Sequence, residues 1–294
     1  MGSKVVATPD EAVEDIRGGS VIGVAHWAGI VGCPLWLQDA FWRRVGKENL
    51  RDFSIFTNGP GFSFTFPALA QMPDLCKRYI GEWMESWIYQ KGRVKKIWYD
   101  FYNTLLIDPS IDTPLKKANR AGEVEMEVTP LGLLAMKVVA GAMGIPAFYS
   151  PYRRQSGYEE FKERRFFDGK PYYLEESITL DYGLIKASKA DTLGNLTFRG
   201  VQGAFGETIA KTAKFTIAEV DEVVEAGELE PEVINVPAIF VDRIVKVPPE
   251  PPESLCPREL YDLFFHRHLD WKSFGWKDHQ ERVRKWEEKK SQRK

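Results

Sequence analysis

The sequence is poor in cysteine and has no long hydrophobic run. Its three cysteines, Cys33, Cys76 and Cys256, are far apart and form no CxxC pair. This spacing argues against a disulfide framework and a zinc site, and it fits a reducing cytoplasm. The longest apolar stretches are about ten residues, whereas a membrane span needs about 20. Residues 1–16 also lack the apolar core of a signal peptide. These absences predict a cytoplasmic protein that does not cross a membrane.

An excess of charge of one sign is also lacking. The chain has 40 Lys and Arg against 42 Asp and Glu, a net charge of −2, which argues against a nucleic-acid partner. Common active-site signatures are missing as well: there is no P-loop, no GxSxG nucleophile elbow and no HExxH motif. His266 and His268 form an HxH pair without a nearby thiolate or third histidine, so we expect no metal site.

The first half of the chain alternates short apolar strands with helices. Thr8-Pro9, with Glu11 three residues after the cap, predicts a helix that ends at Gly18-Gly19. Pro34 opens a second helix after a glycine-containing loop at 26–34. Strands are expected at 20–25, 53–58, 94–101, 124–128 and 145–150, and a further helix at 131–143. The pattern predicts an α/β fold with an open, mostly parallel sheet and helices on both faces.

In the second half of the chain, the expected strands follow one another with few helices between them. Asp168-Gly169 lies between aromatic runs and predicts a hairpin over 166–173. Further strands are expected at 182–187, 196–199, 215–220 and 239–247. We therefore divide the chain into a main domain at 1–247, a Pro-rich linker at 248–256 that we expect to be extended, and an aromatic and charged helical extension at 257–294.

Three loops of the main domain are predicted to share one edge of the sheet. The loops at 26–34, 58–61 and 129–131 each follow an expected strand, and ligands of such folds bind beyond the carboxyl ends of the strands. The Gly29-xx-Gly32-x-Pro34 segment is either a tight turn or a place where a substrate carbonyl or phosphate approaches the backbone.

Several fragments occur in an order and spacing that point to one family. They are 144–149 (GIPAFY), 167–170 (FDGK), 184–191 (LIKASKAD), 194–196 (GNL), 216–220 (TIAEV) and 237–245 (PAIFVDRIV). Over residues 5–247 the chain resembles the α (A) subunit of family I coenzyme A transferases.

The resemblance implies an enzyme with two kinds of subunit. The chain would act with a β subunit, usually in an α2β2 assembly, and the nucleophilic glutamate of the family lies on that β subunit. A coenzyme A thioester and a carboxylic acid would be the substrates. Neither a permanently bound cofactor nor a metal would be needed, because the thioester energy is kept throughout the reaction. The covalent glutamyl intermediate divides one difficult step into easier ones.

The resemblance also implies which residues surround the acyl group. We expect substrate contacts from His26, Trp27, Gly29, Gly32, Asn58, Leu131 and Phe205. Asn58 stands at the family's asparagine position and is the best candidate for a polar contact near the reacting carbonyl. An asparagine that merely tolerates the turn is the alternative.

This chain departs from the family where the substrate should lie. His26-Trp27-Ala28 replaces Gly-Gly-Phe, Leu131 replaces a glutamine, and Gly203-Ala204-Phe205-Gly206 replaces Arg-Asn-Phe-Asn. Polar groups are lost and an aromatic ring and an imidazole are gained. We therefore expect an acyl group that is bulkier and less polar than succinyl or acetoacetyl.

The residues leave other readings open. His26 is a candidate acid or base because its ordinary pKa is near neutrality. The alternative is a loop histidine that is hydrogen-bonded to the backbone. The carboxylate of Glu207 is a second candidate catalytic group. The same fold could also carry acyl-CoA hydrolysis, ring opening or decarboxylation. A non-catalytic ligand-sensing or scaffold module is the third reading.

Overall fold

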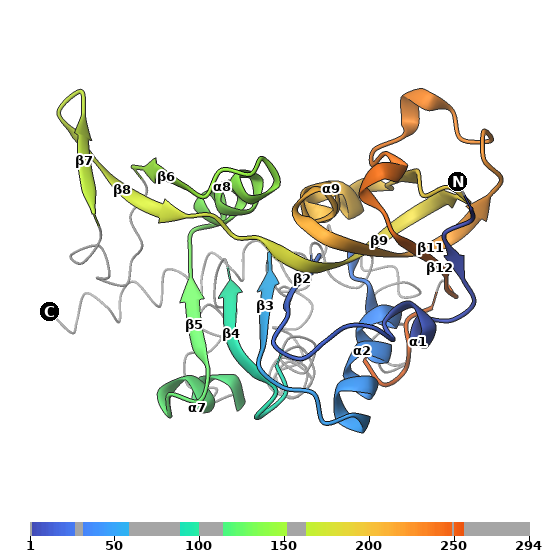
Figure 1. Ribbon diagram of the computed structural model, residues 1–294, viewed down its shortest axis with the longest axis horizontal. Coiled ribbons are helices and arrows are strands. Elements are labelled where there is room, and N and C mark those ends of the chain that lie inside the picture. Colours follow the sequence, from blue (N-terminus) through green and yellow to red (C-terminus); the bar gives the residue numbers. More distant parts are fainter. Residues whose placement is uncertain are drawn as a thin grey trace, which may run out of the picture.

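A nine-stranded sheet forms the centre of the molecule (Figure 1). The computed structural model describes residues 2–26, 32–58, 89–99, 114–151, 163–248 and 250–255. Within these ranges the strand order is β1-β12-β11-β9-β2-β3-β4-β5, and β10 pairs with β9. Every neighbouring pair in this order is parallel, and only β10 runs antiparallel to its neighbour. The predicted open, mostly parallel sheet is therefore confirmed.

The strands of this sheet are short in the first half of the chain and long in the second. They are Val5–Val6 (β1), Val21–Val24 (β2), Phe53–Thr57 (β3), Val94–Tyr99 (β4), Glu125–Val128 (β5), Leu180–Asp191 (β9), Leu196–Thr197 (β10), Ala213–Val224 (β11) and Arg243–Lys246 (β12). The sequence pattern predicted only the central parts of β9 and β11, and it did not predict β1.

Helices cover both faces of the sheet (Figure 1). On one face lie α1 (Pro9–Ala12) and α2 (Leu35–Lys47), and on the other lie α8 (Leu131–Ala142) and α9 (Gly203–Thr212). A further helix, α7 (Pro114–Arg120), precedes β5. Each face has its own apolar core, one containing Leu37 of α2 and the other containing Leu134 and Ile209 of α8 and α9. Because helices cover the two faces, the loops lie at the two ends of the parallel strands. The end at which the strands finish is called the carboxyl edge.

Helix α1 begins as predicted. The Thr8 Oγ1 atom accepts a hydrogen bond from the Glu11 N–H at 3.2 Å, and the Ala7 N–H donates to Glu11 Oε2 at 2.9 Å. This pair resembles a capping box, except that the Glu11 carboxylate accepts from Ala7, the residue before the N-cap, instead of from Thr8 itself.

Helix α1 ends at Ala12, however, and not at Gly18-Gly19 as expected. In a longer helix, the carbonyls of Ala12, Val13 and Ile16 would accept hydrogen bonds from N–H groups of the following turn. Here they accept hydrogen bonds from two arginines that are distant in sequence. Arg243 donates to Ala12 O at 3.1 Å, and Arg44 donates to Val13 O and Ile16 O at 2.8 and 2.5 Å. Tertiary donors thus replace the last helical turn.

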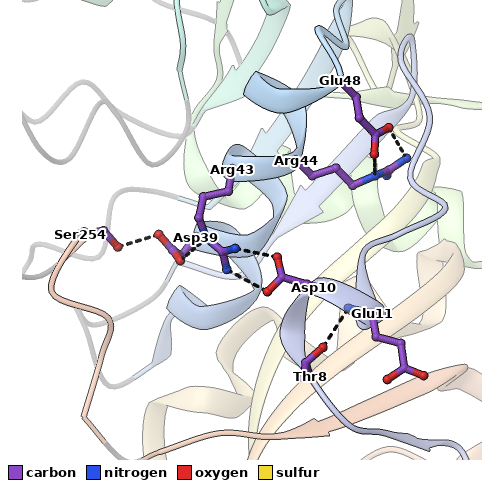
Figure 2. A network of polar contacts seen from close by, with 8 residues as sticks. All are labelled: Thr8, Asp10, Glu11, Asp39, Arg43, Arg44, Glu48 and Ser254. Atoms are coloured by element: carbon purple, nitrogen blue, oxygen red, sulfur yellow. Dashed lines mark hydrogen bonds and ion pairs between the residues drawn. The ribbon is translucent and has the colours of Figure 1, made fainter.

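An ion pair joins α1 to α2 on the outer surface of the molecule (Figure 2). The Arg43 guanidinium donates to both carboxylate oxygens of Asp10, at 2.6 and 3.1 Å, and to Asp39 at 2.9 Å. All three side chains reach solvent, so this pair contributes at most about 1 kcal/mol to stability.

The Pro-rich segment lies along α2 in the residues that the structure describes. The Trp36 Nε1–H donates to the Glu250 carbonyl at 2.9 Å, and Ser254 Oγ donates to Asp39 Oδ1 at 2.6 Å (Figure 2). Leu255 is buried in the core on the α2 face. Residues 250–255 are therefore docked on the main domain, and the expected extension at 257–294 lies outside the described residues.

The expected strand at 145–150 does not join the main sheet. Strand β6 (Ala147–Ser150) pairs with β8 (Lys170–Glu176), and β8 pairs with β7 (Arg164–Phe167), in a separate antiparallel sheet. Helix α8 packs directly against the chain after β8, where a Cβ at Gly141 would lie 2.0 Å from the Ile178 carbonyl oxygen. All four residues of β6 pair with β8, so the backbone groups of β6 are satisfied outside the main sheet.

The hairpin between β7 and β8 is confirmed. Asp168 and Gly169 both have positive φ, at 50° and 74°, as a two-residue turn of this kind requires.

The expected strand at 239–247 is correct only in its second part. Ala238–Phe240 forms a 3-10 turn, and β12 begins at Arg243. The Lys4 ammonium donates to the carbonyls of Ala238 and Val241 at 2.7 and 2.6 Å. These carbonyls therefore face a lysine instead of a neighbouring strand.

No helix in the described ranges is both long enough and apolar enough to span a bilayer.

Candidate functional site

Three of the predicted loops begin at one edge of the sheet. His26 follows β2, Asn58 follows β3 and Thr129 follows β5, and these three strands run parallel with β4 between β3 and β5. The structure thus places His26, Asn58 and Thr129 along the carboxyl edge, as the sequence predicted. Trp27, Gly29 and residues 59–61 lie outside the described residues, and Gly32 is buried before α2.

His26 and Asn58 are in direct contact. The His26 backbone N–H donates to Asn58 Oδ1 at 2.9 Å, and His26 Nδ1 lies 2.9 Å from Thr57 Oγ1. All three side chains are fully buried. The imidazole therefore joins the ends of β2 and β3, and the backbone of the same residue fixes the amide of Asn58 through its oxygen.

A third element supports this contact. Gln38, in the first part of α2, is almost fully buried and interacts with the His26 side chain. Burial lowers the pKa of His26 to about 4, and the interaction with Gln38 opposes that change only in part. Because burial penalises the charged form, the imidazole is neutral near pH 7.

The start of α2 is held by a buried carboxylate from the centre of the sheet. Glu219 Oε2, on β11, accepts the Leu37 N–H at 3.0 Å, and the Trp36 backbone N–H is a second donor to the same side chain. A carboxylate at this position satisfies backbone donors that have no partner within the helix and interacts favourably with the helix dipole. Glu219 thereby fixes the helix that carries Gln38.

Glu219 is itself part of a buried cluster of charges. Its Oε1 atom lies 3.4 Å from Lys186 Nζ, which also contacts Asp221 at 2.9 Å. Burial raises the pKa of Glu219, and Lys186 and the backbone donors oppose this rise. The cluster joins α2 to β9 and β11, whose register places Glu219 opposite Lys186.

Buried polar atoms without a hydrogen-bond partner among the described residues lie at the carboxyl edge. Asn58 Nδ2 and Thr129 Oγ1 are among them, and both residues are fully buried. Buried polar atoms in native proteins nearly always have a partner, and leaving one unpaired costs about 1–3 kcal/mol. Such atoms, on the edge where ligands of this fold bind, make this edge the candidate site.

The other face of the sheet is apolar at this edge. Phe205 of α9 and Phe56 of β3 lie with ring centroids 6.3 Å apart, and Leu131 packs against the same cluster. Leu131 and Phe205 thus belong to the same apolar cluster, and their contact with an acyl group stays a prediction. A Cβ at Gly206 would lie 2.8 Å from the Phe198 ring, which explains why a glycine follows Phe205.

Glu207 lies in a different environment. Its side chain is half exposed and pairs with Lys211 one turn along α9, and the Lys211 ammonium lies 5.9 Å from the centroid of Phe240. These contacts place Glu207 toward the outer side of α9.

Sequence reasoning missed Gln38 and Glu219. Glu219 had a local signal, a lone carboxylate within the apolar run of β11. Thr129 was placed at this edge as part of the loop at 129–131, but it was given no role of its own. Within the described ranges, no three His, Cys, Asp or Glu side chains gather closely enough to hold a metal ion.

Comparison with known proteins gives consistent matches. The sequence pattern of the family described as coenzyme A transferase matches residues 86–247. The α (A) subunit of the succinyl-CoA:3-ketoacid coenzyme A transferase of Helicobacter pylori is 35% identical over 83% of this chain and 92% of its own length. The α (A) subunit of the 3-oxoadipate CoA-transferase of Pseudomonas putida is 36% identical over 84% of this chain and 95% of its own.

A solved structure shares the fold. The acyl-CoA transferase apoenzyme of Escherichia coli O157:H7 superimposes with a TM-score of 0.66 at 19% identity, covering 86% of this chain. This chain spans about half of that protein, 48% of its length.

Proposed function

The chain belongs to the coenzyme A transferase family, among its α subunits, and on this premise we propose how it shares a reaction with a second chain. It shapes the acyl site of an enzyme that moves coenzyme A from an acyl-CoA to a carboxylic acid. The β subunit completes the enzyme in an α2β2 assembly and supplies the attacking glutamate. The unpaired amide nitrogen of Asn58 at the carboxyl edge is the observation that carries this role.

The proposed chemistry begins on the partner. The glutamate carboxylate attacks the thioester carbonyl, the C–S bond breaks, and an acyl-glutamyl anhydride and a coenzyme A thiolate form. The thiolate then attacks the glutamyl carbonyl, which releases the first acid and leaves a glutamyl-CoA thioester. The acceptor acid repeats these two steps in reverse. The thioester is the substrate and no permanently bound cofactor takes part.

Asn58 is proposed to donate to the carbonyl oxygen that becomes negative during attack. Its oxygen is already bound by the His26 N–H, so the free end of the amide is its NH2 group. The orientation is therefore set before the substrate arrives. A preorganised donor of this kind contributes about 3 kcal/mol to transition-state stabilisation.

His26 is proposed to position Asn58 and not to transfer protons. Its pKa of about 4 means that the imidazolium form is absent near pH 7. Its ring nitrogen Nδ1 is also directed at Thr57. Glu207 is proposed to have no part in the reaction, because it is half exposed and paired with Lys211.

The apolar half of the edge is proposed to select the acyl group. Leu131 and Phe205 border a cluster of apolar side chains, and neither offers a hydrogen bond to a second carboxylate. A site without such a partner does not reward a polar substituent. We therefore propose an acyl group bulkier and less polar than succinyl, with contributions from Trp27, Gly29 and Gly32 of the preceding loop.

The test is reconstitution of the chain with its β subunit. We expect CoA transfer between an acyl-CoA and a free acid by the complex, and none by this chain alone. Asn58→Asp keeps the oxygen that His26 binds and removes the donor, so it should lower kcat about 100-fold or more. Asn58→Asp with full activity would contradict the role of the amide.

Two other outcomes would replace this proposal. Release of free coenzyme A without an acceptor acid, or loss of carbon dioxide from the acyl group, would assign hydrolysis or decarboxylation to the complex. A chain that purifies alone, stable and inactive, and gains no activity with any β subunit would be a non-catalytic module.

A further inference from the structure

Helix α8 has an apolar stripe on its exposed side. Met136, Val139 and Met143 are exposed by 41, 42 and 70%, and Gly132, one turn before Met136, is exposed as well. Residues spaced by three or four positions lie on one side of a helix, so these four form a row, the α8 stripe. The helix packs against α9 and β6 (Figure 1), and the stripe is the side that these contacts leave open.

The charged side of α8 faces inward, which is the reverse of an ordinary surface helix. Lys137 is the only charged residue of α8. Its side chain is buried and is bound by Glu127 at 2.9 Å and by Glu175 at 3.4 Å. A surface helix places its charged residues toward water, whereas a helix that is apolar all round is buried. Helix α8 therefore has the composition of a helix that is covered on every side.

The chain directly after α8 extends the apolar surface. Ile145 is also exposed, and its N–H donates to the Ala140 carbonyl at 2.9 Å, so it is held against the end of the helix. Gly144 has a positive φ of 70°, which allows this return of the chain. Single exposed apolar side chains are normal, whereas a continuous group of them marks an interaction surface. The stripe and Ile145 form such a group.

The position of the stripe indicates which chain covers it. Helix α8 begins at Leu131, two residues after Thr129 at the carboxyl edge, and the stripe begins at Gly132. A chain that covers the stripe therefore lies beside this edge. The relatives of this chain are named as A subunits, and the proposed reaction needs a glutamate of the β subunit at the same edge. A second copy of this chain would cover the stripe without supplying that group.

We infer that the α8 stripe is a docking surface for the β subunit. The inference rests on the proposed function, because that function requires a β subunit at the carboxyl edge. It adds a location: the partner packs on Met136, Val139 and Met143 and reaches the edge past the first turn of α8. Methionine suits this role, since its unbranched side chain adapts to the surface that it meets.

The first experiment measures binding of the two full-length chains by isothermal titration calorimetry. Val139→Glu places a charge in the middle of the stripe. It should raise the Kd for the β subunit about 100-fold or more, because a charge without a partner is costly in an apolar interface. Ile239→Glu is the matched control, since Ile239 is 77% exposed but lies in the turn before β12. It should change the Kd less than about twofold.

The second experiment needs no variant. The wild-type chain, alone and in the complex, is exposed to hydroxyl radicals, and oxidation of individual side chains is measured by peptide mass spectrometry. We expect oxidation of Met136 and Met143 to fall several-fold in the complex and that of Ile239 to stay unchanged. This measurement decides the question even if Val139→Glu lowers the stability of the chain.

Two results would overturn the inference and leave the proposed function intact. One is a Val139→Glu chain that binds the β subunit as tightly as the wild type, and the other is equal oxidation of the two methionines with and without the β subunit. A wild-type chain that forms a dimer by itself, which Val139→Glu separates without weakening β binding, would assign the stripe to a second copy of this chain. If the wild-type chain binds no β subunit, the proposed function itself fails.

Discussion

Part of the carboxyl edge is held by buried polar side chains that contact the start of α2, whereas the part that faces α8 and α9 is packed with apolar ones. The polar half consists of His26, Gln38, Thr57 and Asn58, supported by Glu219. The apolar half consists of Phe56, Leu131 and Phe205.

The difference between the halves suggests how one edge of the sheet can both orient a hydrogen-bond donor and select an acyl group. Hydrogen bonds are directional, so the polar half fixes a single donor in a defined orientation. Apolar packing depends mainly on the area removed from water, so the apolar half sets the size and polarity of what it accepts. We expect changes in the polar half to affect rate and stability, and changes in the apolar half to affect substrate preference.

The largest effect should come from removing the support of the polar half. Glu219→Ala leaves the start of α2 without its acceptor and Lys186 without one of its two carboxylates, so it should lower the free energy of unfolding by about 3–5 kcal/mol. Urea unfolding followed by tryptophan fluorescence measures this. Glu222→Ala is the matched control, because Glu222 pairs with Lys189 at 2.7 Å on the same two strands but is half exposed. It should cost less than about 1 kcal/mol, and equal losses would mean that burial of Glu219 is unimportant.

The second prediction concerns the pH dependence of the polar half. The pKa of His26 falls from 6.5 to about 4 on folding. A group whose folded pKa is lowered adds stability above its unfolded pKa, and this stability is lost as the pH falls toward the folded pKa. Between pH 6.5 and 4 the wild type should therefore lose about 3 kcal/mol that His26→Asn does not lose. Parallel stability curves for the two proteins over this range would contradict the assignment of a buried, neutral imidazole.

The third prediction tests selection by the apolar half. Leu131→Gln places an amide where the pocket is apolar, so it should raise the kcat/KM of succinyl-CoA relative to a branched or aromatic acyl-CoA by about tenfold. Stability should change little, since Leu131 is only partly buried. A preference for succinyl-CoA already present in the wild type would show that the apolar half does not select as we propose.

The smallest effect should come from the outer surface of α2, away from both halves. Ser254→Ala removes one exposed hydrogen bond to Asp39, so it should lower the free energy of unfolding by about 0.5 kcal/mol. Activity of the reconstituted complex should stay unchanged. A loss as large as that of Glu219→Ala would mean that the docking of residues 250–255 supports the site.

The apolar half was visible in the sequence because it depends on local pattern. Pro130 followed by an apolar run predicted α8, and the glycines around Phe205 were noticed as a departure from the family pattern. The shared edge also followed from the alternation of strands and helices, since parallel strands bring their carboxyl ends together. The hairpin at Asp168-Gly169 was also predicted correctly, because the turn depends only on these two adjacent residues.

Of the polar half, His26 and Asn58 were predicted from the sequence, but Gln38, Thr57 and the supporting Glu219 were not, because their contacts depend on the order of the strands. Glu219 and Leu37 are 182 positions apart, and nothing in either segment indicates that β11 lies behind α2. The separate sheet containing β6 was missed for a similar reason, since no local pattern indicates that β6 pairs with β8 and not with the main sheet. Unpaired atoms such as Thr129 Oγ1 are properties of the folded chain alone.

The most direct test of the central claim asks which chain carries the covalent intermediate. The reconstituted complex is mixed with acyl-CoA and treated with borohydride, which reduces a glutamyl-CoA thioester to a stable alcohol, and both chains are then examined by peptide mass spectrometry. The account predicts a reduced glutamate on the β subunit, with no modification of this chain. A reduced glutamate in this chain would contradict the division of roles between the two subunits.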